Sequence, residues 1–273
     1  MPSLIIPPRD WTAIAWPDVA QQDAARWIAV LPLAATEQHG PHLPVRTDVL
    51  IAEAYLARVR QLLPAGVPAT FLPVEEIGIS TEHTDYPGTL TLSAAEALTN
   101  WLTIGESVAR AGIRKLVMVS SHGGNSAAMT IVAQELRAKH GLLAVTTAWS
   151  RFGAPEGLFT VEELRHGIHG GAVETSIMLA RYPDQVRKAA IANFAPASIA
   201  MERNYRWLST HRPAALAWQA QDMHPSGAAG DATLASAEKG ERLLEHGARA
   251  FCELLQDVDR FDLSALRSVA AKA

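Results

Sequence analysis

The chain has 273 residues, 48% of them hydrophobic and 19% charged, and a formal net charge of -4 at pH 7. This length and composition allow one large buried core. The weak charge excludes the electrostatic field that gathers nucleic acid or an anionic membrane surface. We therefore expect no nucleic-acid partner and no membrane partner, and we expect a small, weakly charged molecule instead.

Features that report on cellular location are few. One cysteine, Cys252, lies in an apolar stretch, which indicates a buried small hydrophobe in a reducing compartment. The amino-terminal segment 1–10 lacks the basic start and the apolar run of a signal peptide. No apolar stretch reaches membrane-spanning length, so a cytoplasmic location is expected.

Segments typical of buried strands alternate along the chain with longer amphipathic segments typical of helices. Strands are expected at residues 27–34, 69–74, 116–121 and 142–147. Helices are expected at residues 48–63, 94–111, 126–140 and 171–181, and a late helix at about residues 232–255. The alternation predicts an α/β fold with a mostly parallel central sheet, in one domain over residues 1–273.

Residues at the predicted helix ends support these assignments. Thr47 or Asp48 is expected to cap the first helix and Ser93 the second, because their side-chain oxygens accept hydrogen bonds from free backbone N–H groups. Gly112 is expected to close the second helix, and Asp231 to cap the late one. The segments 153–157 and 225–230 are expected to be loops inside the domain.

The first polar cluster follows the first predicted strand, where an open α/β sheet forms its reactive crevice. Glu37 and His39 are two residues apart, so an extended backbone directs a carboxylate and an imidazole to the same side, toward one ion. Gly40 and Pro41 turn the chain, which returns Asp48 to the crevice, where its carboxylate can bridge two metals. Taken alone, Glu-x-His is weak evidence, and a polar surface or core pair is a commoner explanation.

The second cluster follows the third predicted strand. His122 stands where this strand ends, and Gly123, Gly124 and Asn125 lead into the next helix. A phosphate held by backbone N–H groups at this turn is an alternative, although no lysine follows the glycines. A capped tight turn with a hydrogen-bonded histidine is the simpler explanation of this cluster alone.

A third cluster precedes the fourth predicted helix. Glu174 lies in the first turn of this helix, where a carboxylate also simply complements the helix dipole. Two glycines precede it, and His169, five residues earlier, supplies a proton carrier, which together indicate catalysis. A polar loop after the second strand contains Ser80, Glu82 and His83, and we expect it to overhang the crevice, either as substrate contacts or as a solvated connection.

Taken together, these motifs resemble the creatininase (creatinine amidohydrolase) family. The first motif, TEQHGPHLP at residues 36–44, is long and specific, and residues 82–89, 122–125 and 169–176 support it. The resemblance implies a three-layer α/β/α fold and a hydrolase acting on carbon–nitrogen bonds other than peptide bonds. It further implies two divalent metal ions per subunit, zinc first with manganese or iron as alternatives, and a homohexamer built from dimers.

By this resemblance, four side chains are metal ligands: Glu37, His39, Asp48 and His122. The carboxylate of Asp48 would bridge the two ions. Creatininase itself has a metal-binding glutamate at the position of Gly124, so the fifth ligand must come from elsewhere, and Glu174 matches a glutamate of many other members. His169 matches the family's catalytic histidine. Creatininase also has a tryptophan four residues before that histidine to stack on its flat substrate, whereas this chain has Arg165, so creatinine is not the expected substrate.

The expected reaction is attack of a metal-activated water on the carbonyl of a small cyclic amide or formamide, with His169 passing a proton to the departing nitrogen. Glu174 is expected to serve in catalysis as well as in metal binding. The expected substrate contacts are Ser80, Glu82, His83, Gly123, Gly124, Asn125 and Trp149. Three alternatives stay open: a peptide-processing member of the family, a protein that binds phosphate or nucleotide at the His122 turn without catalysis, and a member that has lost activity.

Overall fold

A four-stranded parallel sheet forms the centre of the computed structural model, which describes residues 5–20, 24–211 and 213–267. The strand order is β2-β1-β3-β4. The strands are β1 (Ile28–Leu33), β2 (Ala69–Phe71), β3 (Lys115–Ser120) and β4 (Leu143–Ala148). They overlap the four predicted strands, and the expected parallel sheet is confirmed.

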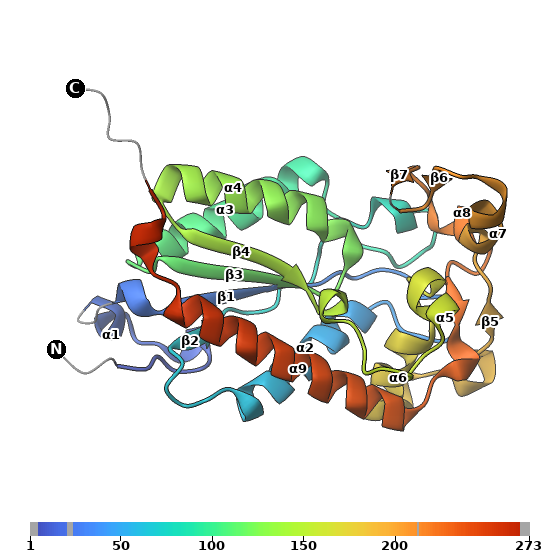
Figure 1. The fold of residues 1–273 in the computed structure, drawn as a ribbon, viewed down its shortest axis with the longest axis horizontal. Helices are drawn as coiled ribbons and strands as arrows, with labels where there is room; N and C mark the ends of the chain where they lie inside the picture. The colour runs from blue at the N-terminus through green and yellow to red at the C-terminus, as the bar shows by residue number, and fades with distance from the viewer. Residues whose placement is uncertain (1–4, 21–23, 212, 268–273) are drawn as a thin grey trace.

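Helices cover both faces of the sheet (Figure 1). One face packs against α3 (Ala94–Arg110) and α4 (Ser126–His140). The other face packs against α2 (Thr47–Leu62) and α9 (Ala237–Arg260), and α6 (Ala172–Arg181) lies against these two helices. The three-layer α/β/α architecture is therefore confirmed.

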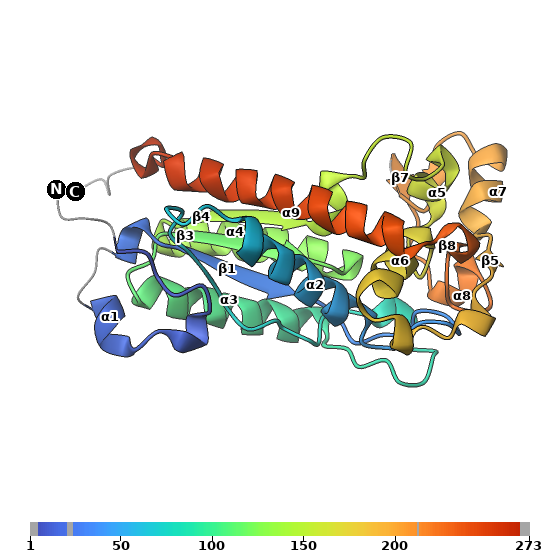
Figure 2. The same ribbon diagram turned by 90° about the horizontal axis from the view of Figure 1, so that it is seen from below.

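Short elements gather beyond the carboxyl ends of the sheet strands, whereas α1 (Trp16–Ala20) lies near the opposite end (Figure 2). The gathered helices are α5 (Val161–His166), α7 (Ala197–Asn204) and α8 (Ala220–Met223). Beside them lie an antiparallel pair, β5 (Asn193–Phe194) with β8 (Gly230–Asp231), and a parallel pair, β6 (Leu208–Ser209) with β7 (Ala214–Ala215). Residues 153–157 and 225–229 are loops as expected, and Gly230 begins β8.

The sheet has one hydrophobic core on each side, because successive side chains of a strand point to opposite faces. In β1, Ile28 and Val30 belong to the core under α2 and α9, whereas Ala29 and Leu31 belong to the core under α3 and α4. β3 divides its side chains in the same way. Burial on both faces explains why these strands are continuous apolar runs in the sequence.

The outer edge of β2 is covered by the amino-terminal segment. Phe71 N–H donates to the Arg9 carbonyl (2.8 Å), and Arg9 Nη1 donates to the carbonyls of Val67 (2.6 Å) and Ala69 (3.1 Å). β2 also ends earlier than the predicted residue 74, because Pro73 has no N–H to donate to a strand ladder.

The predicted ends of the second helix are confirmed at α3. The Ser93 hydroxyl accepts a hydrogen bond from Glu96 N–H (3.3 Å), and the Glu96 carboxylate accepts one from Ser93 N–H (2.8 Å). Gly112 follows the helix with a φ of +85°, a backbone conformation that favours glycine.

The predicted cap of the first helix was wrong. Thr47 and Asp48 both lie inside the first turn of α2, after Arg46, and neither caps it. The Thr47 hydroxyl donates to the carbonyl of Pro44 (2.6 Å). The carboxylate of Asp48 is therefore left to face the crevice at the ends of the strands.

The late helix also differs from its prediction. Asp231 caps a short 3-10 turn, Ala232–Leu234, by accepting a hydrogen bond from Thr233 N–H (3.0 Å). The long helix α9 begins at Ala237, after Ser236 as its cap, and continues to Arg260. Two capping residues lie five positions apart, and the helical pattern alone did not show that the chain turns between them.

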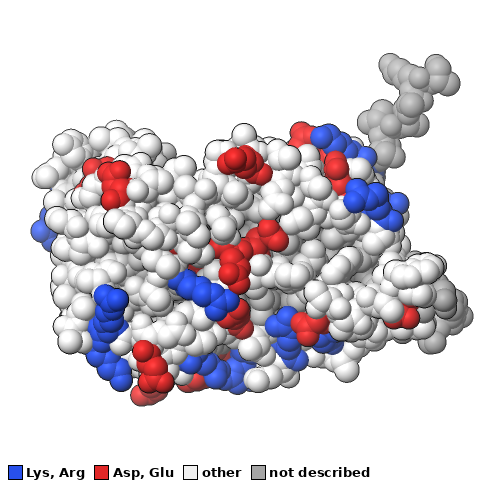
Figure 3. All heavy atoms as spheres, turned by 180° about the vertical axis from the view of Figure 1, so that it is seen from behind, with Lys and Arg blue, Asp and Glu red and all other residues white. Residues whose placement is uncertain are grey.

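On the face of the molecule in Figure 3, basic and acidic side chains lie beside one another in small groups, and wide uncharged areas separate these groups. Neither sign forms a continuous surface over the residues described on this face. Among the described residues, no helix combines the length and the apolar character needed to cross a bilayer.

Gly240 tests the contact between α9 and α6. A Cβ at Gly240 would lie 2.0 Å from the Ser176 carbonyl oxygen, so Gly240→Ala must push the two helices apart. Overpacking of this kind costs about 1–3 kcal/mol, and alanine gains ~1 kcal/mol by helix propensity, so we expect a net loss of up to about 2 kcal/mol in the free energy of unfolding. Urea denaturation measures it. Gly66→Ala is the control, because no atom lies within 4 Å of its added Cβ; equal effects of the two substitutions would contradict the close contact.

Candidate metal centre

Two polar segments meet at the carboxyl ends of β1 and β3, which are neighbours in the sheet. β2 follows β1 in sequence but lies on its other side, so the strand order reverses between β1 and β3. Open α/β sheets form their binding crevices at such a switch point. Glu37 and His39 follow β1, and His122 follows β3, so the sheet itself brings these three side chains together.

The first group of candidate ligands is Glu37, Asp48 and His122, all of them buried. His122 Nδ1 lies 3.2 Å from Glu37 Oε1 and 3.5 Å from Asp48 Oδ2. The three ligand atoms lie within 4.8 Å of one another, a spacing that one divalent ion can span.

The second group is His39, Asp48 and Glu174. His39 Nε2 lies 3.6 Å from Asp48 Oδ1 and 3.7 Å from Glu174 Oε2. Asp48 thus belongs to both groups and presents a different carboxylate oxygen to each histidine. A carboxylate placed in this way could hold two cations, one through each oxygen.

The outward nitrogen of each histidine is held by a backbone carbonyl. His122 Nε2 donates to the carbonyl of Ile79 (2.7 Å), and His39 Nδ1 donates to the carbonyl of Glu37 (3.0 Å). In the neutral rings, these bonds leave the lone pair on His122 Nδ1 and on His39 Nε2, the two nitrogens that face the carboxylates. Metal-binding histidines are oriented by the same kind of second hydrogen bond.

Buried polar atoms without partners show that this cluster fits cations. Among the described residues, both carboxylate oxygens of Glu37, Nε2 of His39 and Oδ2 of Asp48 are buried and have no hydrogen-bond partner. Such atoms are costly in a protein interior unless a hydrogen bond or an ion satisfies them. Mixed imidazole and carboxylate donors suit zinc and also suit manganese and iron.

The charges of the cluster displace its pKa values. Burial lowers the pKa of His39, but Asp48, Glu174 and Glu37 outweigh burial and raise this pKa to about 9. The pKa of His122 rises against burial to about 10, mainly through Glu37. Burial raises the pKa of Glu174 to about 7, although His39 opposes the rise.

His169 and His83 complete the cluster. The ring of His169 lies between those of His39 and His83, with centroid distances of 4.1 and 4.2 Å. Its Nδ1 is 3.6 Å from Glu37 Oε1, and its Nε2 donates to the carbonyl of Gln38 (2.6 Å). Burial and the neighbouring histidines hold the pKa of His169 well below its usual range, so its ring is neutral.

Gln38 is a functional residue that sequence reasoning missed. It is buried, and its side-chain Nε2 donates to His83 Nδ1 (2.7 Å) and to the carbonyl of Gly227 (2.9 Å). The same residue therefore positions both His83, through its amide, and His169, through its carbonyl. The signal that the sequence offered was its position between Glu37 and His39. It was missed because an extended backbone directs the side chain of Gln38 to the side opposite theirs.

Asn125 and Ser80, two of the predicted substrate contacts, are both buried in these loops. Asn125 is fully buried; its Oδ1 accepts from Ile79 N–H (3.0 Å) and its Nδ2 donates to the carbonyl of Ala34 (3.0 Å). Its amide thus joins the loops that follow β1 and β2 to the loop that follows β3. Ser80 is also fully buried, and its hydroxyl has no partner among the described residues. Contact of either residue with a substrate stays a prediction.

Glu82 occupies the space beside Gly124. A Cβ at Gly124 would lie 2.8 Å from Glu82 Oε1 and 2.4 Å from both His122 Nε2 and the carbonyl of Ile79. A side chain at position 124 therefore cannot fit without displacing the loop. Glu82 Oε1 itself lies 3.6 Å from His122 Nε2, on the side away from the first ligand group.

Trp149 follows β4 directly and is 4% exposed. Its ring stacks on that of Tyr55, with centroids 4.4 Å apart and planes 5° apart. Both rings line a hollow of about 350 Å³ whose wall also includes Gly123 and Glu174. The structure thus places Trp149 beside the cluster, and its contact with a substrate stays a prediction.

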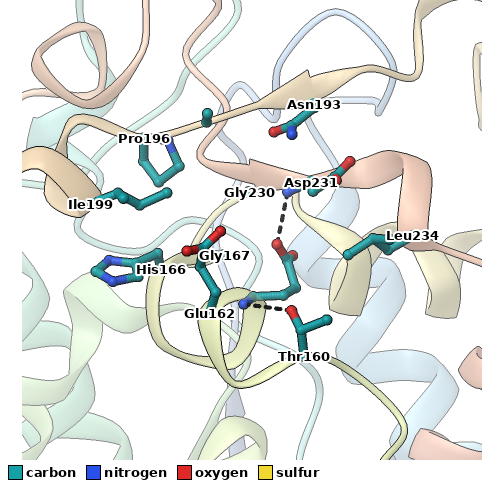
Figure 4. A pocket seen from close by; sticks show the side chains of 12 residues that line it. Thr160, Glu162, His166, Gly167, Asn193, Pro196, Ile199, Gly230, Asp231 and Leu234 are labelled. Atoms are coloured by element: carbon teal, nitrogen blue, oxygen red, sulfur yellow. Dashed lines mark hydrogen bonds between the residues drawn. The ribbon is translucent and has the colours of Figure 1, made fainter.

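Glu163 is a second buried group that the sequence did not reveal. Its carboxylate accepts a hydrogen bond from Ala172 N–H (2.6 Å), the first residue of α6, and one from Asp231 N–H (2.8 Å) in β8. Figure 4 shows the latter bond at a second hollow, beside Thr160 and Leu234. Glu163 thereby holds the start of the helix that carries Glu174.

The sequence pattern of the creatininase family, described as creatinine amidohydrolase, matches residues 12–255. The chain belongs to the creatininase family. A crystal structure of creatinine amidohydrolase (creatininase) superposes with a TM-score of 0.75 at 25% identity and covers 93% of this chain and 99% of that one. Structures of a zinc–zinc type and of a manganese form of creatininase superpose with TM-scores of 0.73 and 0.74, each at 24% identity.

Curated relatives extend this assignment to proteins with different activities. The mycofactocin precursor peptide peptidase of Mycobacterium ulcerans is 30% identical over 246 residues, which are 87% of this chain and 86% of that protein. The creatinine amidohydrolase of Pseudomonas putida is 29% identical over 242 residues, or 83% of this chain and 87% of that protein. The chain is therefore a hydrolase of the creatininase family, and the family does not fix its substrate.

Removal of metal with a chelator tests the cluster. In the metal-free protein, the raised pKa values of His39 (about 9) and His122 (about 10) mean that their protons stabilise the fold fully below pH 6.5, and that this stabilisation is lost as the pH rises through those values. Metal ions require the same nitrogens without protons, so stabilisation by metal grows with pH.

The expected result is a difference in melting temperature, between zinc-loaded and chelator-treated protein, that increases by several degrees from about pH 6 to about pH 9. Differential scanning calorimetry at matched ionic strength measures it. A difference that is absent or that shrinks over this range would contradict metal binding by these histidines.

Proposed function

We propose that the protein is a metal-dependent amidohydrolase that opens a carbon–nitrogen bond in a small cyclic amide or formamide at a two-metal site. The observation that carries this proposal is that two of the three ligand groups found among the described residues share Asp48. We assign zinc first, with manganese or iron as alternatives, because the donors are two imidazoles and three carboxylates. The zinc and manganese forms of creatininase support this assignment.

Five side chains would hold the metal: Glu37, His39, Asp48, His122 and Glu174. Two divalent ions there supply Lewis-acid polarisation of the amide carbonyl and a water of lowered pKa as the nucleophile. The protein's own contribution is orientation. Ile79 and Glu37 fix the two histidine rings through backbone carbonyls, and Glu163 fixes the start of α6.

His169 is suited to move a proton. Its Nε2 hydrogen is fixed on the carbonyl of Gln38, so Nδ1 carries the lone pair and faces Glu37 at 3.6 Å. A neutral ring in this position can take a proton at Nδ1 and pass it to the departing amide nitrogen. Glu174, whose pKa is raised to about 7 mainly by burial, can share in proton transfer from the wall of the hollow.

The substrate is not creatinine in this proposal. At the position where creatininase stacks a tryptophan on its substrate, Arg165 pairs with Glu202 at 2.5 Å on α7. No flat ring is offered there. A peptide is the second candidate substrate, because relatives that cover most of this chain are named as peptidases of a precursor peptide.

A phosphate-binding role at the His122 turn is less well supported. Glu82 Oε1 would lie 2.8 Å from a Cβ at Gly124, so a carboxylate already borders the glycine turn. A negative group beside the turn opposes an anionic ligand. A cytoplasmic location, expected from the sequence, and a hexamer, implied by the resemblance, both remain proposals. Light scattering of the purified protein tests the hexamer.

Asp48 tests the two-metal proposal. Asp48→Asn keeps the shape of the side chain but removes its charge and one of its ligand oxygens. We expect elemental analysis to show the loss of at least one metal ion per chain, and hydrolysis in a screen of cyclic amides and formamides to fall by at least about 100-fold. Asp184→Asn, at an exposed carboxylate, should change neither quantity. Full activity of Asp48→Asn would refute the shared ligand.

His169 tests the proton path separately from the metal. His169→Ala should lower kcat by about 10²–10⁴-fold while the metal content stays unchanged, because the proton carrier is lost and the ligands remain. His140→Ala removes a surface histidine that pairs with Glu106 and serves as the control. An unchanged kcat for His169→Ala would exclude it as the proton carrier.

A further inference from the structure

The hollow beside the candidate metal centre is lined mostly by apolar side chains and has a volume of about 350 Å³. This size lies within the range of small-molecule binding pockets, about 300–1,000 Å³. Its walls come from α2, α5 and the residues after it, α6, α9, the chain after β4 and the turn after β3. It therefore opens at the end of the sheet where the ligand groups lie.

Two helices connect the hollow to the ligands. On α2, Ile51 and Tyr55 line the hollow and stand three and seven residues after Asp48, which places all three on one helix face. On α6, Ile177 lines the hollow three residues after Glu174. A molecule held at the ligand groups would thus extend along these faces into the hollow.

The lining carries almost no charge. Among the described residues that form it, none is a lysine or an arginine, and Glu174 is the one charged side chain. The stacked rings of Tyr55 and Trp149 form a flat wall. A charged group of a ligand would lose its hydration there and find no opposite charge, which is costly.

The mouth of the hollow is also apolar. Leu164 on α5 lines it while 51% exposed, and Ile168 lines it while 41% exposed. Large apolar side chains that stay exposed at the rim of a hollow are typical of a ligand-binding groove.

We propose that this hollow binds an uncharged, apolar substituent of the amide substrate, aliphatic or aromatic, next to the bond that is cleaved. The inference rests on the proposed two-metal amidohydrolase function and adds the chemical class of the substrate. It assigns selectivity to Ile51, Tyr55, Trp149, Leu164 and Ile177, and it excludes substrates that carry a carboxylate at this place.

The test measures, by calorimetry, the affinities of three hydroxamates for the zinc-loaded full chain. Their comparison distinguishes binding at the metal centre from binding in the hollow. Acetohydroxamate reports on the metal centre alone, benzohydroxamate adds an apolar ring, and 4-carboxybenzohydroxamate adds the same ring with a charge. We expect benzohydroxamate to bind about 10- to 100-fold more tightly than acetohydroxamate, as for burial of an aromatic side chain. The carboxylated ring should show no such gain.

A matched pair of variants on α5 locates the effect. Leu164→Lys places a positive charge at the mouth, so the gain from the apolar ring should fall severalfold, and binding of 4-carboxybenzohydroxamate should rise about two- to fivefold. Val161→Lys adds the same charge on the same helix at a residue that is 82% exposed and outside the hollow. It should leave all three affinities unchanged.

Each result decides one of the two proposals. Tight binding of acetohydroxamate without a gain from the apolar ring, or an equal gain from the charged ring, overturns the hollow as the binding site and leaves the metal centre in place. Failure of acetohydroxamate to bind, together with failure of the protein to retain zinc, overturns the proposed function and the inference with it.

Discussion

The parallel pairing of β1 with β3 brings together the ligands Glu37, His39 and His122 of the candidate centre. The register sets Leu33 beside Ser120, and the chain leaves both strands at the same edge of the sheet. Glu37 and His122 follow within a few residues and meet at 3.2 Å. α2 then returns Asp48 to this edge, and α6 contributes Glu174. A shift in this pairing would separate the ligands without changing any of them.

The ligand cluster and the hollow are two different kinds of surface, one charged and one apolar. The cluster concentrates buried negative charge, which protonated histidines balance in the metal-free protein and cations would balance in the loaded one. The described residues that line the hollow, in contrast, include no charged side chain other than Glu174. Glu174 stands where the two meet, with a side chain that is 20% exposed, so it faces both the ligands and whatever enters the hollow.

The sequence was enough to predict the sheet, the principal helices and the convergence of Glu37, His39, Asp48 and His122, because these features depend on local periodicity and on strand ends. It did not reveal Gln38 or Glu163. Their roles depend on groups 45 residues away in the case of His83 and 68 residues away in the case of Asp231. The start of α9 was missed for a related reason, since Ser236 N–H donates to Ser176 Oγ (3.2 Å) and this long-range contact fixes where the helix begins.

Arg9 affects whether the edge strand β2 can pair with a strand of another molecule. A strand at the border of a sheet exposes N–H and C=O groups that can recruit a strand from another molecule. Here the carbonyls of Val67 and Ala69 already accept the guanidinium of Arg9, and Phe71 N–H already donates to the Arg9 backbone. Arg9, which carries none of the chemistry, thus occupies groups of this edge strand that could otherwise pair with a strand of another molecule.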